Sequence, residues 1–155
     1  MIKANVEINN KSWHSKIKNP KKYFQKRLNK IFKIISFFKR KKIIFTILLT
    51  DSTYIKKLNK KFRKRNKATD VLSFPYFNVK DLRLMRRNKI YIGDIAVCFE
   101  VIKLRSKKNN FLTEFDKAWI HGLLHLIGHK HIKNKDYFKM NKVEKRIINS
   151  IESFT

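Results

Sequence analysis

The stretch T-E-F-D-K-A-W-I-H-G-L-L-H-L-I-G-H-K-H, residues 113–131, predicts a helix buried in the core of the protein. Its apolar residues recur at spacings of three and four, which places them on one face of a helix. They are Phe115, Ala118, Trp119, Leu123 and Leu126. Gly128 then has the backbone freedom to adopt the left-handed conformation that ends many helices. We therefore expect a core helix from Thr113 to Gly128, followed by a change of chain direction.

Four of the five histidines of the chain lie close together in this stretch. His121 and His125 are four residues apart, so on a helix their imidazoles lie one above the other and can bind the same cation. The turn at Gly128 can deliver His131 toward the first two. Three imidazoles with a fourth position left to water form the ligand set of a catalytic zinc site. The spacing therefore predicts one Zn²⁺ ion held by His121, His125 and His131.

The other two histidines are expected to have different places. His129 is four residues after His125 but lies beyond the predicted helix end, so we expect it beside the site or exposed. The alternative is that His129 replaces His131 as a ligand. His14 lies in a polar N-terminal stretch and is expected at the surface.

The H-x-x-x-H-x-x-G-x-x-H spacing also occurs in the metzincin proteases, in which a glutamate directly after the first histidine acts as general base. Gly122 occupies that position here. Without a carboxylate at this point the protease mechanism lacks its proton acceptor. The residues therefore argue against a peptidase.

Apolar patterning predicts four strands and about five helices along the chain. The expected strands are 2–9, 43–50, 69–74 and 90–97. Four of the expected helices are 20–39, 99–107, 113–128 and 135–151. The fifth is capped by Asp51 or Ser52 and extends to Phe62. Residues 76–89 are expected to form a basic loop or hairpin connection. Pro75 suits a strand end or an edge strand, and Gly93 marks a bulge or a close approach of two backbone segments. These elements indicate an α+β fold in one domain, residues 1–155.

The charge of the chain indicates a polyanionic partner. Lysine and arginine total 39 against 11 acidic residues, which gives a formal net charge of +28. A basic surface binds phosphate backbones, so nucleic acid is the first partner to consider. The alternative is that most of the charge reflects A/T-rich coding DNA, since 30 lysines are scattered over every segment beside only 9 arginines. An apolar fraction of 43% is enough to fill one core, which argues against a disordered chain.

Three features predict a cytoplasmic protein without a membrane span. The first ten residues lack the apolar core of a secretory signal. The longest uncharged apolar run, Ile43 to Leu49, is much shorter than the roughly 20 residues that cross a bilayer. Cys98 is the only cysteine, so it forms no intramolecular disulfide, which suits a reducing compartment.

Three blocks of the chain are similar to one known family. The first is L-N-K-K-F-R at residues 58–63, followed by A-T-D-V-L-S-F-P at 68–75; the second is I-G-D-I at 92–95; the third is the histidine block at 121–131. In this order they resemble the YbeY-type rRNA maturation factors, which are single-strand-specific, metal-dependent endoribonucleases of bacteria.

The resemblance implies an α+β fold with a small mixed sheet of four strands, and one Zn²⁺ ion held by His121, His125 and His131 on a central helix and the following turn. Arg63 would correspond to the active-site arginine of the family. Its guanidinium suits the negative charge of a phosphodiester transition state. The implied catalytic residues are thus Arg63, His121, His125 and His131.

The role that the resemblance implies is late ribosome maturation, including processing of the 3′ end of the small-subunit ribosomal RNA, and ribosome quality control. The implied partners are single-stranded RNA, ribosomal RNA and the ribosome or its small subunit. The alternative function is a non-catalytic assembly factor that binds ribosomal RNA and is stabilised by zinc.

Two positions depart from the family pattern. Lys130 stands where an aspartate is usual, and Ala68 stands where a proline is usual. Loss of an acidic hydrogen-bond acceptor beside a ligand lowers metal affinity, so lower activity is expected. Asp70 and Asp94, in or beside predicted strands, are expected to have structural roles.

Overall fold

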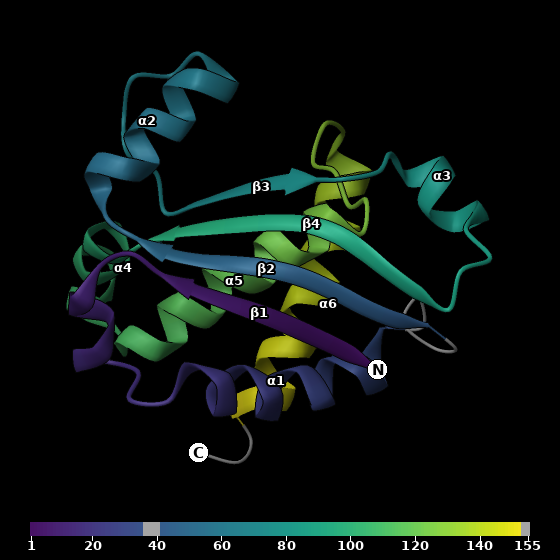
Figure 1. The fold of residues 1–155 in the computed structure, drawn as a ribbon, viewed down its shortest axis with the longest axis horizontal. Helices are drawn as coiled ribbons and strands as arrows, with labels where there is room; N and C mark the ends of the chain where they lie inside the picture. Colours follow the sequence, from purple (N-terminus) through teal and green to yellow (C-terminus); the bar gives the residue numbers. More distant parts are fainter. Residues whose placement is uncertain (36–40, 153–155) are drawn as a thin grey trace.

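The computed structural model describes residues 1–35 and 41–152, and its centre is a mixed sheet of four strands (Figure 1). The strands are β1 (Ile2–Ile8), β2 (Lys42–Thr50), β3 (Val71–Pro75) and β4 (Lys89–Cys98). Their order in the sheet is β1-β2-β4-β3. β2 is parallel to both β1 and β4, whereas β3 is antiparallel to β4. The predicted α+β fold with a small mixed sheet is confirmed, and Pro75 ends an edge strand as expected.

Six α-helices surround this sheet in the described part of the chain. They are α1 (Pro20–Ile34), α2 (Ser52–Arg63), α3 (Val79–Leu84), α4 (Phe99–Arg105), α5 (Phe111–Leu126) and α6 (Asn134–Glu152), with 3-10 turns at Lys11–Ser15 and Ser106–Lys108. Buried residues of α1, α4, α5 and α6 form the main core with one face of the sheet, and α5 and α6 lie behind the sheet in Figure 1. Helix α2 covers part of the other face through a smaller apolar cluster around Ile55. None of the helices in residues 1–35 and 41–152 has the length and apolar character of a membrane span.

Three of the helix boundaries that differ from the prediction do so for a clear local reason. Helix α1 ends at Ile34 because Ile35 is extended, with ψ of 107°; the rest of the predicted helix, through residue 39, lies outside the described residues. Helix α5 begins at Phe111, since the side chain of Asn110 accepts the Leu112 N–H and caps it. Ser106–Lys108 continue α4 as a 3-10 turn.

The predicted hairpin connection between β3 and β4 is confirmed, because the two strands are consecutive and antiparallel, but the connection is not a plain loop, because it contains α3. Asn78 caps the helix by accepting a hydrogen bond from the Asp81 N–H at 2.9 Å. Leu82 is only 1% exposed and joins the main core. One cap and one buried leucine are too weak a pattern to stand out among the basic residues of this segment.

A buried carboxylate fixes the position of α5, the helix that carries two of the candidate ligands. Asp116 accepts hydrogen bonds from the Tyr23 hydroxyl at 2.7 Å and from the Trp119 indole at 2.8 Å, and its two oxygens lie 2.8 Å from Arg27 Nε. Burial raises the pKa of Asp116, and the Arg27 guanidinium opposes that rise. Because Tyr23 and Arg27 belong to α1, this cluster holds α1 and α5 together.

Gly93 allows β3 and β4 to approach closely at the edge of the sheet. Its φ is +134°, a backbone conformation that other residues rarely adopt, and an added Cβ would lie 2.2 Å from the backbone oxygen of Phe74. The pairing of β4 with β2 also shifts its register between Ile44 and Thr46. Both expectations for Gly93, a bulge and a close backbone approach, are confirmed.

Candidate metal centre

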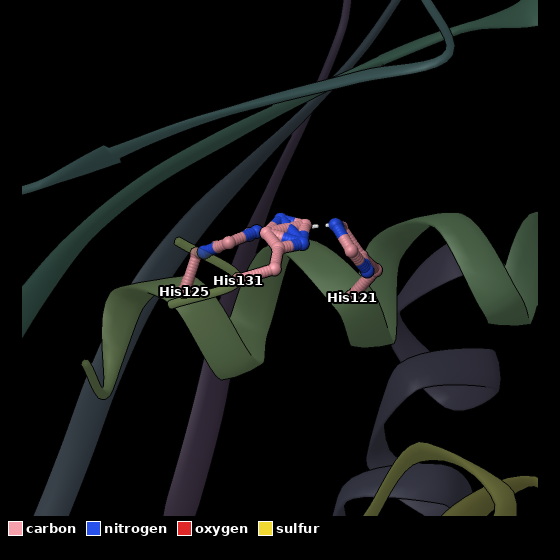
Figure 2. Close-up of side chains that lie close together, drawn as sticks. All are labelled: His121, His125 and His131. Atoms are coloured by element: carbon pink, nitrogen blue, oxygen red, sulfur yellow. Dashed lines mark hydrogen bonds between the residues drawn. The ribbon is translucent and has the colours of Figure 1, made fainter. Parts of the chain in front are cut away.

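The fold brings His121, His125 and His131 together into one cluster. The first two lie on α5 and the third on the segment between α5 and α6, and Figure 2 shows their rings converging above α5. One ring nitrogen from each lies within 4.8 Å of the others, and the ring centroids are 4.5–4.9 Å apart. The predicted set of three histidines is therefore confirmed as a spatial cluster that could hold a metal ion.

The turn after α5 explains how a residue ten positions later returns to the helix. Gly128 has φ of +96°, and its N–H donates to the carbonyl oxygen of His125 at 3.0 Å. The next N–H, of His129, donates to Leu124 O at 3.0 Å. These bonds satisfy the last carbonyl groups of the helix and reverse the chain. A Cβ on Gly128 would lie 2.4 Å from a methyl carbon of Val79, so this turn also packs tightly on α3.

The hydrogen bonds of two rings determine where their lone pairs point. His121 Nδ1 lies 2.5 Å from Glu144 Oε1, and His125 Nδ1 lies 2.8 Å from the backbone oxygen of His129. Because both partners are acceptors, both Nδ1 atoms carry the hydrogen. In the neutral rings each Nε2 atom then has a lone pair, and these two atoms face each other at 3.1 Å.

Without a metal ion, a contact this short requires a proton on one of the two nitrogens, which then donates a hydrogen bond to the other; a metal ion between them would take the place of that proton. Nitrogen ligands about 2.0–2.1 Å from a tetrahedral Zn²⁺ are separated by about 3.3–3.4 Å, close to the observed spacing. Imidazole suits Zn²⁺ and other transition metals better than Mg²⁺ or Ca²⁺. The residues present therefore fit a transition-metal ion, with His121 and His125 already oriented to bind it.

Burial keeps His125 in the form that a metal requires. Loss of hydration, together with the neighbouring His121, lowers the pKa of His125 to about 4. The imidazole is thus neutral at pH 7 and free to donate its Nε2 lone pair. His129 also has a lowered pKa because of burial, but it contributes its backbone oxygen rather than its ring to this cluster.

Glu144 on α6 is the functional residue that the sequence reasoning missed. It accepts the Nδ1 hydrogen of His121, an arrangement in which a carboxylate orients a histidine ligand. The sequence did contain a signal, because Glu144 lies four residues after Met140 and three before Ile147, both buried. An acidic residue on the apolar face of an amphipathic helix is a candidate for a buried partner.

We expect Glu144→Ala to lower the affinity of the protein for Zn²⁺ by about 10–100-fold, and Glu144→Gln by a smaller factor, since the amide oxygen still accepts the hydrogen bond. Competition with a chromophoric chelator measures the affinity. Glu114→Gln is the matched control, because Glu114 lines the same groove but pairs with Lys117. Equal affinities of the parent and both Glu144 variants would show that Glu144 has no part in metal binding.

The histidine cluster opens into a groove of about 1080 Å³ between α2, β3, α5 and the turn after α5. Arg63 lines this groove with all three histidines. Arg105 pairs with Asp70, and Lys117 pairs with Glu114. Residues 1–35 and 41–152 offer no ion-pair partner to Arg63. Its guanidinium is thus available to an anion in the groove.

The end of α2 is held by Asn59. Lys64 adopts a left-handed conformation, with φ of 59°, and its N–H donates to the backbone oxygen of Asn59. The Asn59 side chain is 2% exposed and donates to Lys67 O at 2.8 Å. These bonds fix the turn that follows Arg63, and the second of them requires a side-chain donor at residue 59.

Gly122 faces the sheet. A Cβ there would lie 2.9 Å from a methyl carbon of Ile95 and 3.0 Å from the hydroxyl oxygen of Ser73. The Ser73 hydroxyl donates to Gly122 O at 3.1 Å, which ties β3 to α5 beside His121. A side chain at residue 122 would therefore begin inside the packed layer, in agreement with the argument against a peptidase.

The remaining predicted residues lie outside the ligand cluster. Asp70 accepts a hydrogen bond from the Thr69 hydroxyl and forms an ion pair with Arg105. Asp94 accepts a hydrogen bond from the Tyr91 hydroxyl at 2.5 Å. These contacts agree with the structural roles expected for both aspartates. Lys130 and His14 are exposed.

A cluster of three histidines that opens into a groove lined by an arginine is the kind of site that metal-dependent hydrolases use. The family model for Endoribonuclease YbeY matches residues 7–152. The chain therefore belongs to the YbeY family of endoribonucleases.

Three relatives illustrate this membership. The chain is 43% identical to Endoribonuclease YbeY of Pelagibacter ubique, over 99% of this chain and 98% of that protein. It is 34% identical to Endoribonuclease YbeY of a Wolbachia species from Drosophila simulans, over 94% and 93%. The solution structure of TM1509 from Thermotoga maritima shares the fold, with a TM-score of 0.64 and 24% identity over 99% of this chain and 90% of that one.

Proposed function

We propose that this protein is a zinc-dependent endoribonuclease that cleaves single-stranded segments of ribosomal RNA during late ribosome maturation. Its tasks would include processing of the 3′ end of the small-subunit rRNA and ribosome quality control. The observation that carries the proposal is the pair of Nε2 atoms of His121 and His125, 3.1 Å apart beside His131 in a groove that Arg63 also lines. Family membership supports the choice of RNA. Ribosomes and the cytoplasm in which they mature are the partner and the location that this function requires.

Each residue has a part in the proposed chemistry. A single bound Zn²⁺ would supply a Lewis acid and lower the pKa of a water ligand toward 7. His121, His125 and His131 would hold the ion, and Glu144 fixes the ring of His121. The guanidinium of Arg63 would bind the non-bridging phosphate oxygens, on which negative charge accumulates. Attack by water and attack by the RNA 2′-hydroxyl leave different ends, so analysis of the products distinguishes them.

Cleavage of a single-stranded RNA that carries the small-subunit 3′ end tests the proposal. We expect zinc-loaded parent protein to cleave it, and Arg63→Ala to lower kcat by about 100–1000-fold, as removal of one charge-stabilising donor does elsewhere. Lys60→Ala is the control, since Lys60 is exposed on the same helix and does not line the groove.

Two outcomes would contradict the proposal. If Arg63→Ala and His121→Ala cleave as fast as the parent protein, the activity comes from a contaminant. If metal-loaded parent protein binds this RNA without cleaving it, the alternative of a non-catalytic assembly factor is favoured.

A further inference from the structure

Phe62 is an exposed aromatic side chain at the end of α2. Ile55, two turns earlier, is fully buried, whereas 56% of the surface of Phe62 is accessible. The ring meets Phe74 of β3 in a T-shaped contact, with centroids 5.1 Å apart and planes at 65°. A single exposed ring is common on protein surfaces. What distinguishes Phe62 is its location.

Phe62 lines the same groove as the histidine cluster, directly before Arg63. Phe62 contacts Phe74, and the neighbouring Ser73 bonds to Gly122 beside His121; these two residues of β3 point to opposite faces of the sheet, and since both line the groove, it extends around the free edge of β3. In Figure 1, α2 and the yellow-green segment between α5 and α6 lie along the same side of β3. A strand of RNA in this groove would thus pass both Phe62 and the metal ligands.

The charges of the groove suit a polyanion. Of its basic side chains, Arg105 and Lys117 have carboxylate partners. Within the part of the chain that the structure describes, Arg63 and Lys130 form no ion pair. Unpaired cations together with an accessible ring are the combination by which proteins bind single-stranded nucleic acid, the cations holding phosphates and the ring stacking on a base.

We propose that Phe62 stacks on an unpaired base of the bound RNA, next to a phosphate held by Arg63. This inference rests on the proposed function and adds a base-binding subsite to it. A base inside a duplex is already stacked on both faces, so the contact selects for single strands. Lys61 Nζ lies 5.2 Å from the centroid of the Phe62 ring. A base displaces this ammonium group, because base–aromatic stacking is more favourable than a cation–π contact between a solvated ammonium group and an exposed ring.

Two oligomers of equal charge test the subsite. The first is a 2′-O-methyl oligoadenylate of about twelve units, within the range of known single-strand sites, and the second is the same backbone without bases. Fluorescence anisotropy measures their binding to the zinc-loaded protein. We expect Phe62→Ala to weaken binding of the adenylate oligomer by about 5–150-fold, which corresponds to about 1–3 kcal/mol. Binding of the abasic oligomer should not change, and Phe62→Trp should bind the adenylate oligomer as the parent does.

Phe138→Ala is the matched control, because Phe138 is 68% exposed but does not line the groove. Unchanged adenylate binding by Phe62→Ala, or an equal loss on both oligomers, would overturn the stacking proposal. Neither result affects the proposed function if the parent protein cleaves RNA. Conversely, suppose that the parent protein fails to cleave RNA while Phe62→Ala still weakens binding of the adenylate oligomer alone. That result would contradict the nuclease function and support the base-binding subsite.

Discussion

His125→Ala is expected to remove bound metal and to lower RNA cleavage by more than about 100-fold, the upper range for loss of a residue that only supports a ligand. The Nε2 atom of His125 lies 3.1 Å from that of His121 and would be one of the three metal ligands. Alanine has no nitrogen to replace it, so only two ligands would remain. Elemental analysis of purified protein measures the metal content. Less than about half an equivalent of zinc is expected in the variant, against about one in the parent.

His129→Ala provides the control for this prediction. The substitution keeps the backbone oxygen that bonds to His125 Nδ1 and removes only the ring, so zinc content should not change. His131→Ala should lose metal, because its ring belongs to the cluster. If His129→Ala loses zinc while His131→Ala retains it, the assignment of the third ligand is wrong.

Gly93→Ala is expected to lower the free energy of unfolding by about 4 kcal/mol. The positive φ of 134° strains any side chain, and such strain costs about 1–3 kcal/mol. The new Cβ would also lie 2.2 Å from the backbone oxygen of Phe74, so β3 must move, and overpacking of this kind costs about 1–3 kcal/mol. Urea unfolding of both proteins in the same metal state measures the difference.

Gly122→Ala gives the comparison for Gly93. Residue 122 has ordinary helical geometry, and its added Cβ would meet side-chain atoms of Ile95, Ser73 and Val71 at 2.9–3.1 Å, which can shift by a few tenths of an ångström. Alanine also favours the helix by about 1 kcal/mol relative to glycine. The net loss should therefore be clearly smaller than for Gly93→Ala. An equal or larger loss would show that the strand pairing at Gly93 is not the tighter constraint.

The parts of the structure that could be predicted are those encoded by local patterns. The apolar spacing of α5, the turn at Gly128 and the spacing of His121, His125 and His131 are contained in one short stretch, and the structure agrees with each. Arg63 was named through the resemblance of the 58–63 block, and the structure places it in the same groove.

The unpredicted parts depend on contacts between distant segments. Asp116 forms hydrogen bonds with Tyr23 and Arg27, about 90 positions earlier in the chain. Glu144 on α6 forms a hydrogen bond with His121 on α5. No local pattern indicates which residues will meet in this way. Helix α3 was missed for a different reason, since six residues with one buried leucine show too little periodicity to be recognised.

The packing of Gly122 limits how this scaffold could be redesigned. Its histidine spacing matches that of the metzincin proteases, which have a glutamate where this chain has Gly122. Because the position lies against Ile95, Ser73 and Val71, a glutamate added there would have to displace side chains of β3 and β4. The substitution of Gly122 by glutamate would therefore also require repacking between α5 and the sheet.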